Sequence, residues 1–303
     1  MSRSAARDVW VVAGHELAEA LRSRRVLILA LLYVGGAVGG TLILIESLRG
    51  LEAMLAETLA VGTSERPGTF TQELMGSAQA QRFLARVLDD AELAAELVSI
   101  PPLSLFYGWL VLAFCPALVM LTASESVAVD LATGAARFSL VRTPRLSFSA
   151  GKFVGQAALL GVSILCGGVG VWVTGYLEFE GFEPLASAAW MLVLAGRGFI
   201  YCLAYVGLAV GLSHLTRSVP WSRALGLIAL GVASALWGLA QLRWTSEHLG
   251  ALPRALLPLL PKAHQSDLWR PEWIERAPAQ LMLCALAVFY FSLGYRFRAR
   301  RDT

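Results

Sequence analysis

Residues 26–45 read VLILALLYVGGAVGGTLILI, a run without a single charged side chain. A helix needs about 20 consecutive apolar residues to cross the hydrocarbon core of a bilayer. Lipid offers no hydrogen-bond partner to backbone amides, so a run of this kind must satisfy them internally as a helix. The stretch therefore predicts a transmembrane helix over 26–45.

Further apolar runs follow along the chain, and they predict spans over 104–124, 153–177, 187–212, 224–242 and 279–295. The composition agrees, because 56% of the residues are hydrophobic, 16% are charged and the mean hydropathy is +0.61. Soluble domains are typically about 45–50% apolar and about 25% charged. The excess of apolar surface must face lipid. We therefore expect an all-α polytopic membrane protein of six transmembrane helices, with residues 1–303 forming one domain.

The charges of the connecting segments predict the orientation of the chain. Residues 1–25 carry five basic and three acidic residues, 46–102 carry four and nine, and 125–152 carry four and two. Positive segments remain on the cytoplasmic side of a membrane. Both termini and residues 125–152 are therefore predicted to be cytoplasmic.

Three segments outside the spans have recognisable patterns. In residues 1–25, Val9, Trp10, Ala13, Leu17 and Leu21 recur at helical spacing, and the charged residues, Glu16 among them, are assigned to the other face. This pattern predicts an elbow helix lying in the membrane interface, although a short soluble helix is the alternative.

Residues 46–102 predict a small helical cap outside the cell, and residues 243–278 predict broken outer helices because prolines interrupt them. The acidic surface of the cap is either a partner site or a solvated face. Glycines four apart predict close helix packing: Gly35 with Gly39, Gly36 with Gly40, and Gly207 with Gly211. Packing within one subunit is favoured, and a dimer seam is the alternative.

The sequence contains no pattern of a catalytic or metal site. Its four histidines form no His-x-x-x-His pair, and Gly151-Lys152 lacks the rest of a phosphate-binding loop. We therefore expect no catalytic residue, metal or cofactor in this chain, and the net charge of +3 is too small to indicate nucleic-acid binding. Arg197 is the only charge within a predicted span. It is either a structural partner of Glu178, Glu180 or Glu183, or a residue of the substrate or gating pathway.

Residues 123–152 carry the most specific motifs. They contain, in order, Ala123-Ser124-Glu125, Asp130, Thr133-Gly134, Leu140, Thr143-Pro144-Arg145 and Gly151-Lys152. This order resembles the ABC-2 type permeases, in particular the six-span group of nitrous oxide reductase maturation and gliding motility. Ala135 stands where that family usually has threonine, and the leucine run at residues 139–141 is weaker than usual.

The resemblance implies the membrane subunit of an ABC transporter in a plasma membrane, the inner membrane of a bacterium. ATP and magnesium would be bound by a separate cytoplasmic ATPase in two copies, and a second permease copy would complete a homodimer. Residues 125–152, called here the coupling segment, would contact that ATPase; the alternative is an ordinary loop held at lipid headgroups. The implied coupling residues are Glu125, Asp130, Gly134, Arg137, Leu140, Pro144, Arg145, Gly151 and Lys152.

The resemblance favours export, or movement of lipids, peptides or polymers, over nutrient uptake. A second hypothesis is force transmission to an extracytoplasmic partner without cargo. A third is an ion-gradient transporter or a membrane enzyme, which is disfavoured because no predicted span contains a carboxylate.

Overall fold

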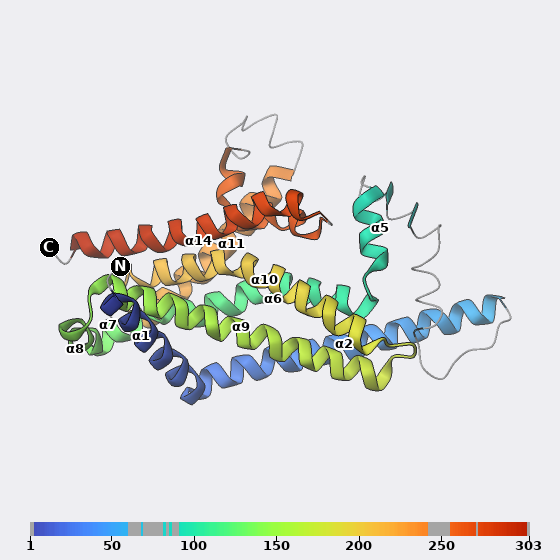
Figure 1. Ribbon diagram of the computed structural model, residues 1–303, viewed down its shortest axis with the longest axis horizontal. Helices are drawn as coiled ribbons and strands as arrows, with labels where there is room; N and C mark the ends of the chain where they lie inside the picture. Colours follow the sequence, from blue (N-terminus) through green and yellow to red (C-terminus); the bar gives the residue numbers. More distant parts are fainter. Residues whose placement is uncertain are drawn as a thin grey trace.

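The computed structural model describes residues 3–59, 68, 81–82, 85–86, 91–241, 255–270 and 272–301. Within these residues it contains six helices long and apolar enough to cross a membrane, which confirms the predicted fold class. They lie side by side along the long axis of the molecule (Figure 1). These helices are α2 (Arg24–Leu59), α6 (Pro102–Thr122), α9 (Arg145–Glu178), α10 (Pro184–Ser213), α11 (Val219–Gln241) and α14 (Trp273–Arg301).

Helix α10 forms the centre of the bundle and packs against α6, α9 and α14. Its contact with α14 is close because glycines line it: a Cβ atom at Gly207 would lie 2.2 Å from the carbonyl oxygen of Ala287. The predicted packing role of Gly207 and Gly211 within one subunit is confirmed. For Gly35, Gly36 and Gly39 packing within one subunit is wrong, because a Cβ atom at any of them would meet nothing within 4 Å. At Gly40 a Cβ atom would lie 3.4 Å from Phe106 Cζ.

The helices extend beyond the predicted spans. Helix α2 continues without a break from the predicted end at Ile45 to Leu59, and α9 begins directly after Pro144. Hydropathy detects the part of a helix that suits lipid, whereas the helix itself can continue beyond that part through charged residues, as α2 does. Of the predicted cap, α5 (Ala91–Ser99) is a helix, and most of residues 60–90 lie outside the described part.

Helix α1 (Arg3–Arg22) packs along α9, which confirms the predicted helix before the first span. Val9 and Ala13 face the protein, whereas Trp10, 70% exposed, and Leu21 face outward. The assignment of Glu16 to the outer polar face is wrong, since its side chain is buried against α9. The location of α1 in the membrane interface stays a prediction.

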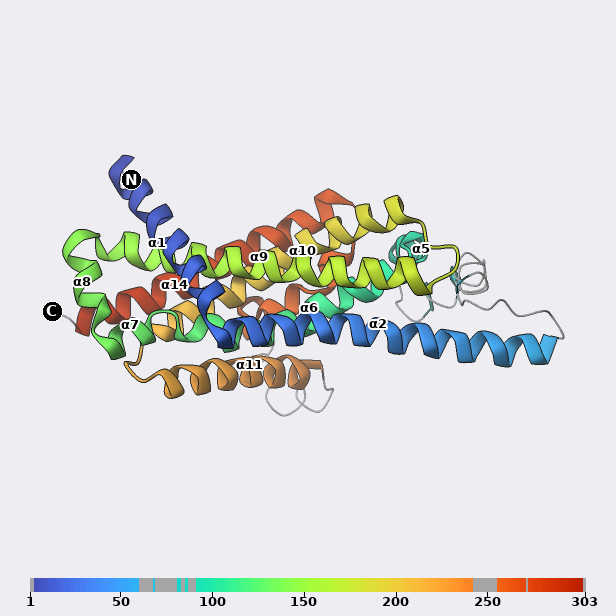
Figure 2. The same cartoon turned by 90° about the horizontal axis from the view of Figure 1, so that it is seen from below.

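The described part of the outer segment 243–278 is broken as expected. It consists of the short 3-10 helices η2 (Leu257–Leu259), η3 (Pro261–His264) and η4 (Ser266–Trp269) before α14 begins. Both termini lie at one end of the bundle, with the short helices α7 (Ala128–Thr133) and α8 (Ala135–Arg142), whereas α5 lies at the other end (Figures 1 and 2).

Candidate functional site

The coupling segment folds into two short helices joined by a glycine turn. Helix α7 ends at Gly134, whose φ of 78° places it in the left-handed region that glycine adopts without strain, and α8 starts at the next residue. Thr143 is extended, as expected before a proline, and Pro144 then starts α9. The two breaks predicted from the sequence are therefore present, and they make α8 a projecting corner (Figure 2).

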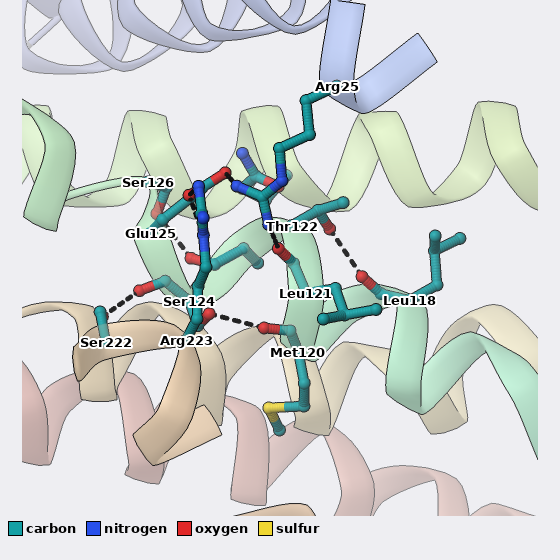
Figure 3. Close-up of polar contacts among 12 residues, drawn as sticks. Arg25, Leu118, Met120, Leu121, Thr122, Ser124, Glu125, Ser126, Ser222 and Arg223 are labelled. Atoms are coloured by element: carbon teal, nitrogen blue, oxygen red, sulfur yellow. Dashed lines mark hydrogen bonds and ion pairs between the residues drawn. The ribbon is translucent and has the colours of Figure 1, made fainter. Parts of the chain in front are cut away.

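Glu125 lies in η1 (Ala123–Glu125), between two arginines from distant parts of the chain. Its carboxylate forms ion pairs with Arg25 at the start of α2 and with Arg223 in α11, whose Nε donates to Glu125 Oε2 at 2.6 Å (Figure 3). Arg25 Nη2 also donates to the carbonyl oxygen of Leu121 at 3.0 Å. Glu125 thus joins the ends of α2, α6 and α11 at one point.

Two serines fasten the backbone beside Glu125. The backbone amides of Val127 and Ala128 both donate to Ser213 Oγ, each at 2.9 Å, so the end of α10 caps the start of α7. The hydroxyl of Ser222 in α11 donates to the carbonyl oxygen of Ser124 (Figure 3). The start of the coupling segment is therefore fixed to α10 and α11 by hydrogen bonds as well as by charge.

Lys152 anchors the other end of the segment. Its ammonium group, in a residue only 5% exposed, forms ion pairs with Glu16 of α1 and, at 2.8 Å, with Asp130 of α7. Gln156 Nε2 donates to Glu16 Oε1 at 2.7 Å. Burial raises the pKa of Glu16 above its ordinary value, and the positive charge of Lys152 opposes that rise. The buried charges join α1, α7 and α9.

Close approach of α1 to α9 requires the glycines at the contact. A Cβ atom at Gly151 would lie 2.5 Å from Val12 Cβ and 2.9 Å from the carbonyl oxygen of Val9. At Gly155 it would lie 2.7 Å from Glu16 Cβ. Gly151 thus allows α1 to approach α9 closely, and α1 carries Glu16, the partner of Lys152.

Replacing Gly151 with alanine is therefore expected to destabilise the docking of α1. Overpacking of a close contact costs about 1–3 kcal/mol, so the melting temperature of the purified protein in detergent should fall. Gly14→Ala in α1 is the matched control, because a Cβ atom there would meet nothing within 4 Å. It should be neutral or slightly stabilising. An equal loss in both variants would contradict the assigned contact.

The outward face of α8 carries two large apolar side chains. Phe138 is 81% exposed and Val141 is 85% exposed, one helical turn apart. Arg137, Arg142 and Arg145 are exposed around them, whereas Leu140 packs inward against the core. The sequence interpretation named the arginines but missed Phe138 and Val141. The sequence signal for this apolar pair was the spacing of Phe138 and Val141, three positions apart in a basic segment.

The predicted coupling residues thus fall into three groups, of which Gly134 in the turn and Leu140 against the core form the first. Glu125, Asp130, Gly151 and Lys152 are brought into the anchoring network, while Arg137, Pro144 and Arg145 lie on the surface. Their role in coupling stays a prediction. The sequence interpretation did not find the partners Glu16, Arg25 and Arg223.

Arg197 is buried in α10, but its partner differs from those expected. Its Nη2 atom lies 3.5 Å from Glu96 Oε1 in α5, and not beside Glu178, Glu180 or Glu183. The expected partners lie just before α10 in sequence, whereas Glu96 belongs to α5, which precedes α6. Nη1 of Arg197 is buried without a hydrogen-bond acceptor in the described part of the chain.

Comparison with known proteins identifies the family. Residues 10–295 match the model of the ABC-2 family transporter protein. This range includes the coupling segment, five of the six long helices in full, and most of α1 and α14. A search of curated proteins found no match. Membrane domains of this family have no ATPase activity of their own and work with an ABC ATPase. Because the match covers nearly the whole chain, the protein belongs to the ABC-2 family of transporter membrane proteins.

Proposed function

We propose that the chain is one of two identical membrane subunits of an ATP-driven exporter, and that α7 and α8 receive the motion of a separate cytoplasmic ATPase. Both termini then lie in the cytoplasm, and two ATPase copies serve the dimer. The alternation of basic and acidic connecting segments supports this orientation. We infer export rather than uptake because residues 123–152 resemble the six-span permeases, a resemblance that favours export.

One observation carries the proposal: the exposed apolar pair on α8 belongs to a corner that is firmly anchored. Phe138 and Val141 project from a helix surrounded by arginines, and large exposed apolar groups with a basic rim are typical of protein interfaces. A docking helix must also resist being pulled out. The ion pairs of Glu125 and Lys152 supply that resistance.

The contacts indicate how a push on α8 would spread. Helix α8 leads directly into α9, and Lys152 in α9 holds α1 and α7. Glu125 holds the ends of α2 and α11. A displacement of Phe138 would therefore move these five helix ends together, which is the rigid-body type of switching that ATP-driven closure requires.

The proposal is tested by purifying the native complex and measuring ATP hydrolysis. An ABC ATPase should co-purify, and its rate should depend on the permease. Glu125→Gln should lower this dependence while the protein remains in the membrane, because Arg25 and Arg223 lose their shared partner. Glu19→Gln on the exposed face of α1 is the control and should retain coupling. Absence of a nucleotide-binding subunit would contradict the proposal.

Force transmission without cargo is a second candidate, and the ion pair of Arg197 with Glu96 favours it. This pair links α5, in the outer segment, to the central helix α10. Under this hypothesis Glu96→Gln should weaken the response of an extracytoplasmic partner to ATP while ATPase assembly is retained. Continued transport of a cargo by the reconstituted complex without that partner would contradict it.

A further inference from the structure

A cavity of about 660 Å³ lies between α6, α10, α11 and the 3-10 helices η3 and η4. Its volume is within the range of about 300–1,000 Å³ typical of small-molecule sites. None of the coupling residues lines it, so it is separate from the site described above. We call it the outer chamber, because η3 and η4, which belong to the predicted outer segment 243–278, form one of its walls.

The chamber follows one face of α11. Its α11 lining residues are Leu230, Ser234, Trp237 and Gln241, which recur every three or four positions. With a rise of 1.5 Å per residue, the lining from Leu230 to Gln241 is about 16 Å long. The chamber is thus an elongated slot, and its depth suits a chain better than a compact polar solute.

The walls of the chamber differ in polarity. Leu112 and Pro116 of α6 and Leu230 of α11 contribute apolar side chains. Lys262, Gln265 and Ser266, from the segment that contains η3 and η4, contribute polar ones. A molecule that fills the chamber and matches these walls therefore has an apolar chain against α6 and α11 and a polar group at η3 and η4.

Lys262 sets the charge of that polar group. Its Nζ atom lies 4.7 Å from the ring centroid of Trp237, which holds the ammonium group at the chamber wall. In the described part of the chain Lys262 forms no ion pair with a carboxylate. The hydroxyl group of Tyr201 donates to Gln265 Oε1 at 3.5 Å, and it also contacts the hydroxyl of Tyr205 at 3.0 Å. An ammonium group beside neutral hydrogen-bonding groups favours an anionic ligand.

We propose that the outer chamber binds an amphiphile of the anionic lipid class, with its acyl chain between α6 and α11 and its headgroup at Lys262. The inference that this amphiphile is the transported cargo rests on the proposed function. The inference that the chamber binds it does not.

The binding test uses the purified permease in detergent, without ATPase or ATP. Native mass spectrometry would measure retention of hexadecyl phosphate and of hexadecylphosphocholine, which has the same chain but no net charge. The phosphate should bind saturably and more tightly. Lys262→Gln should weaken its binding about tenfold, the effect of one charged hydrogen bond, and Lys262→Arg should retain it.

Two further variants separate the chamber from the rest of the surface. Ala113 lines the chamber and is exposed, so Ala113→Phe should obstruct the chamber beside α6 and reduce binding of both amphiphiles at least tenfold. Arg270→Gln, a half-exposed cation next to η4 that is not a lining residue, should leave binding within twofold. Equal loss in Lys262→Gln and Arg270→Gln, or unchanged binding in Ala113→Phe, would overturn the proposal.

A second measurement separates the two proposals. In the reconstituted complex, hexadecyl phosphate should stimulate ATP hydrolysis, and Lys262→Gln should remove the stimulation. Binding to the isolated permease without any stimulation would exclude the cargo role but leave the site. Failure of any ATPase to associate would contradict the proposed function, while retention of the phosphate by the permease would still support the chamber.

Discussion

Replacing Phe138 and Val141 together with alanine is expected to weaken binding of the ATPase about 30-fold, because an apolar pair at the centre of an interface contributes about 2 kcal/mol or more. The two side chains are among the most exposed large apolar groups in the described part of the protein. Truncation removes contact with a partner without opening a cavity in this chain. The affinity of the purified ATPase for the permease in nanodiscs would measure the effect.

Phe297→Ala is the matched control for this prediction. Phe297 is 51% exposed in α14 at the same end of the bundle, but it is not part of α8. It should leave ATPase affinity unchanged. If instead the α8 variant binds the ATPase normally, the alternative of a loop held at lipid headgroups gains support, and Phe138 and Val141 would then be membrane anchors.

Replacing Lys152 alone with methionine is expected to destabilise the protein by about 3–5 kcal/mol, because the change leaves buried carboxylates without a compensating charge. Glu16 is 6% exposed, and Asp130 belongs to the same cluster. Thermal unfolding in detergent should show a large fall in melting temperature. Arg142→Met, at an exposed position on α8, should have little effect.

A triple variant tests whether the loss comes from uncompensated charge. Adding Glu16→Gln and Asp130→Asn to Lys152→Met removes both carboxylate charges, so most of the stability should return. ATPase coupling should remain impaired, because neutral groups hold α1, α7 and α9 together less strongly. Recovery of neither stability nor coupling would indicate that Lys152 matters through its packing and not through its charge.

The six helices were predictable because the requirement of the bilayer acts on local sequence. Each charge-free run, such as 26–45, contains its own signal. The ends were less predictable: α2 continues to Leu59 through charged residues and through Gly50, and hydropathy does not mark where such a helix stops. The turn at Gly134 and the break at Pro144 were predictable because backbone geometry favours those two residue types there.

The anchoring network was not predictable in the same way, because its pairs are distant in sequence. Arg25 and Glu125 are separated by 100 positions, and Glu16 and Lys152 by 136. Helical periodicity placed Glu16 on the polar face, whereas the buried partners Lys152 and Gln156 make an inward carboxylate tolerable. Arg197 shows the same limit, since its partner Glu96 comes from a helix whose position the sequence did not indicate.

Accessibility of a cysteine at position 141 tests the central claim most directly. Val141→Cys would be made in a background without Cys115, Cys166, Cys202 and Cys284, and treated with a membrane-impermeant maleimide. The account predicts no labelling in intact cells, labelling in inverted vesicles stripped of the ATPase, and protection when the ATPase is added back. Labelling from outside intact cells, or labelling of inverted vesicles that the ATPase does not reduce, would contradict it.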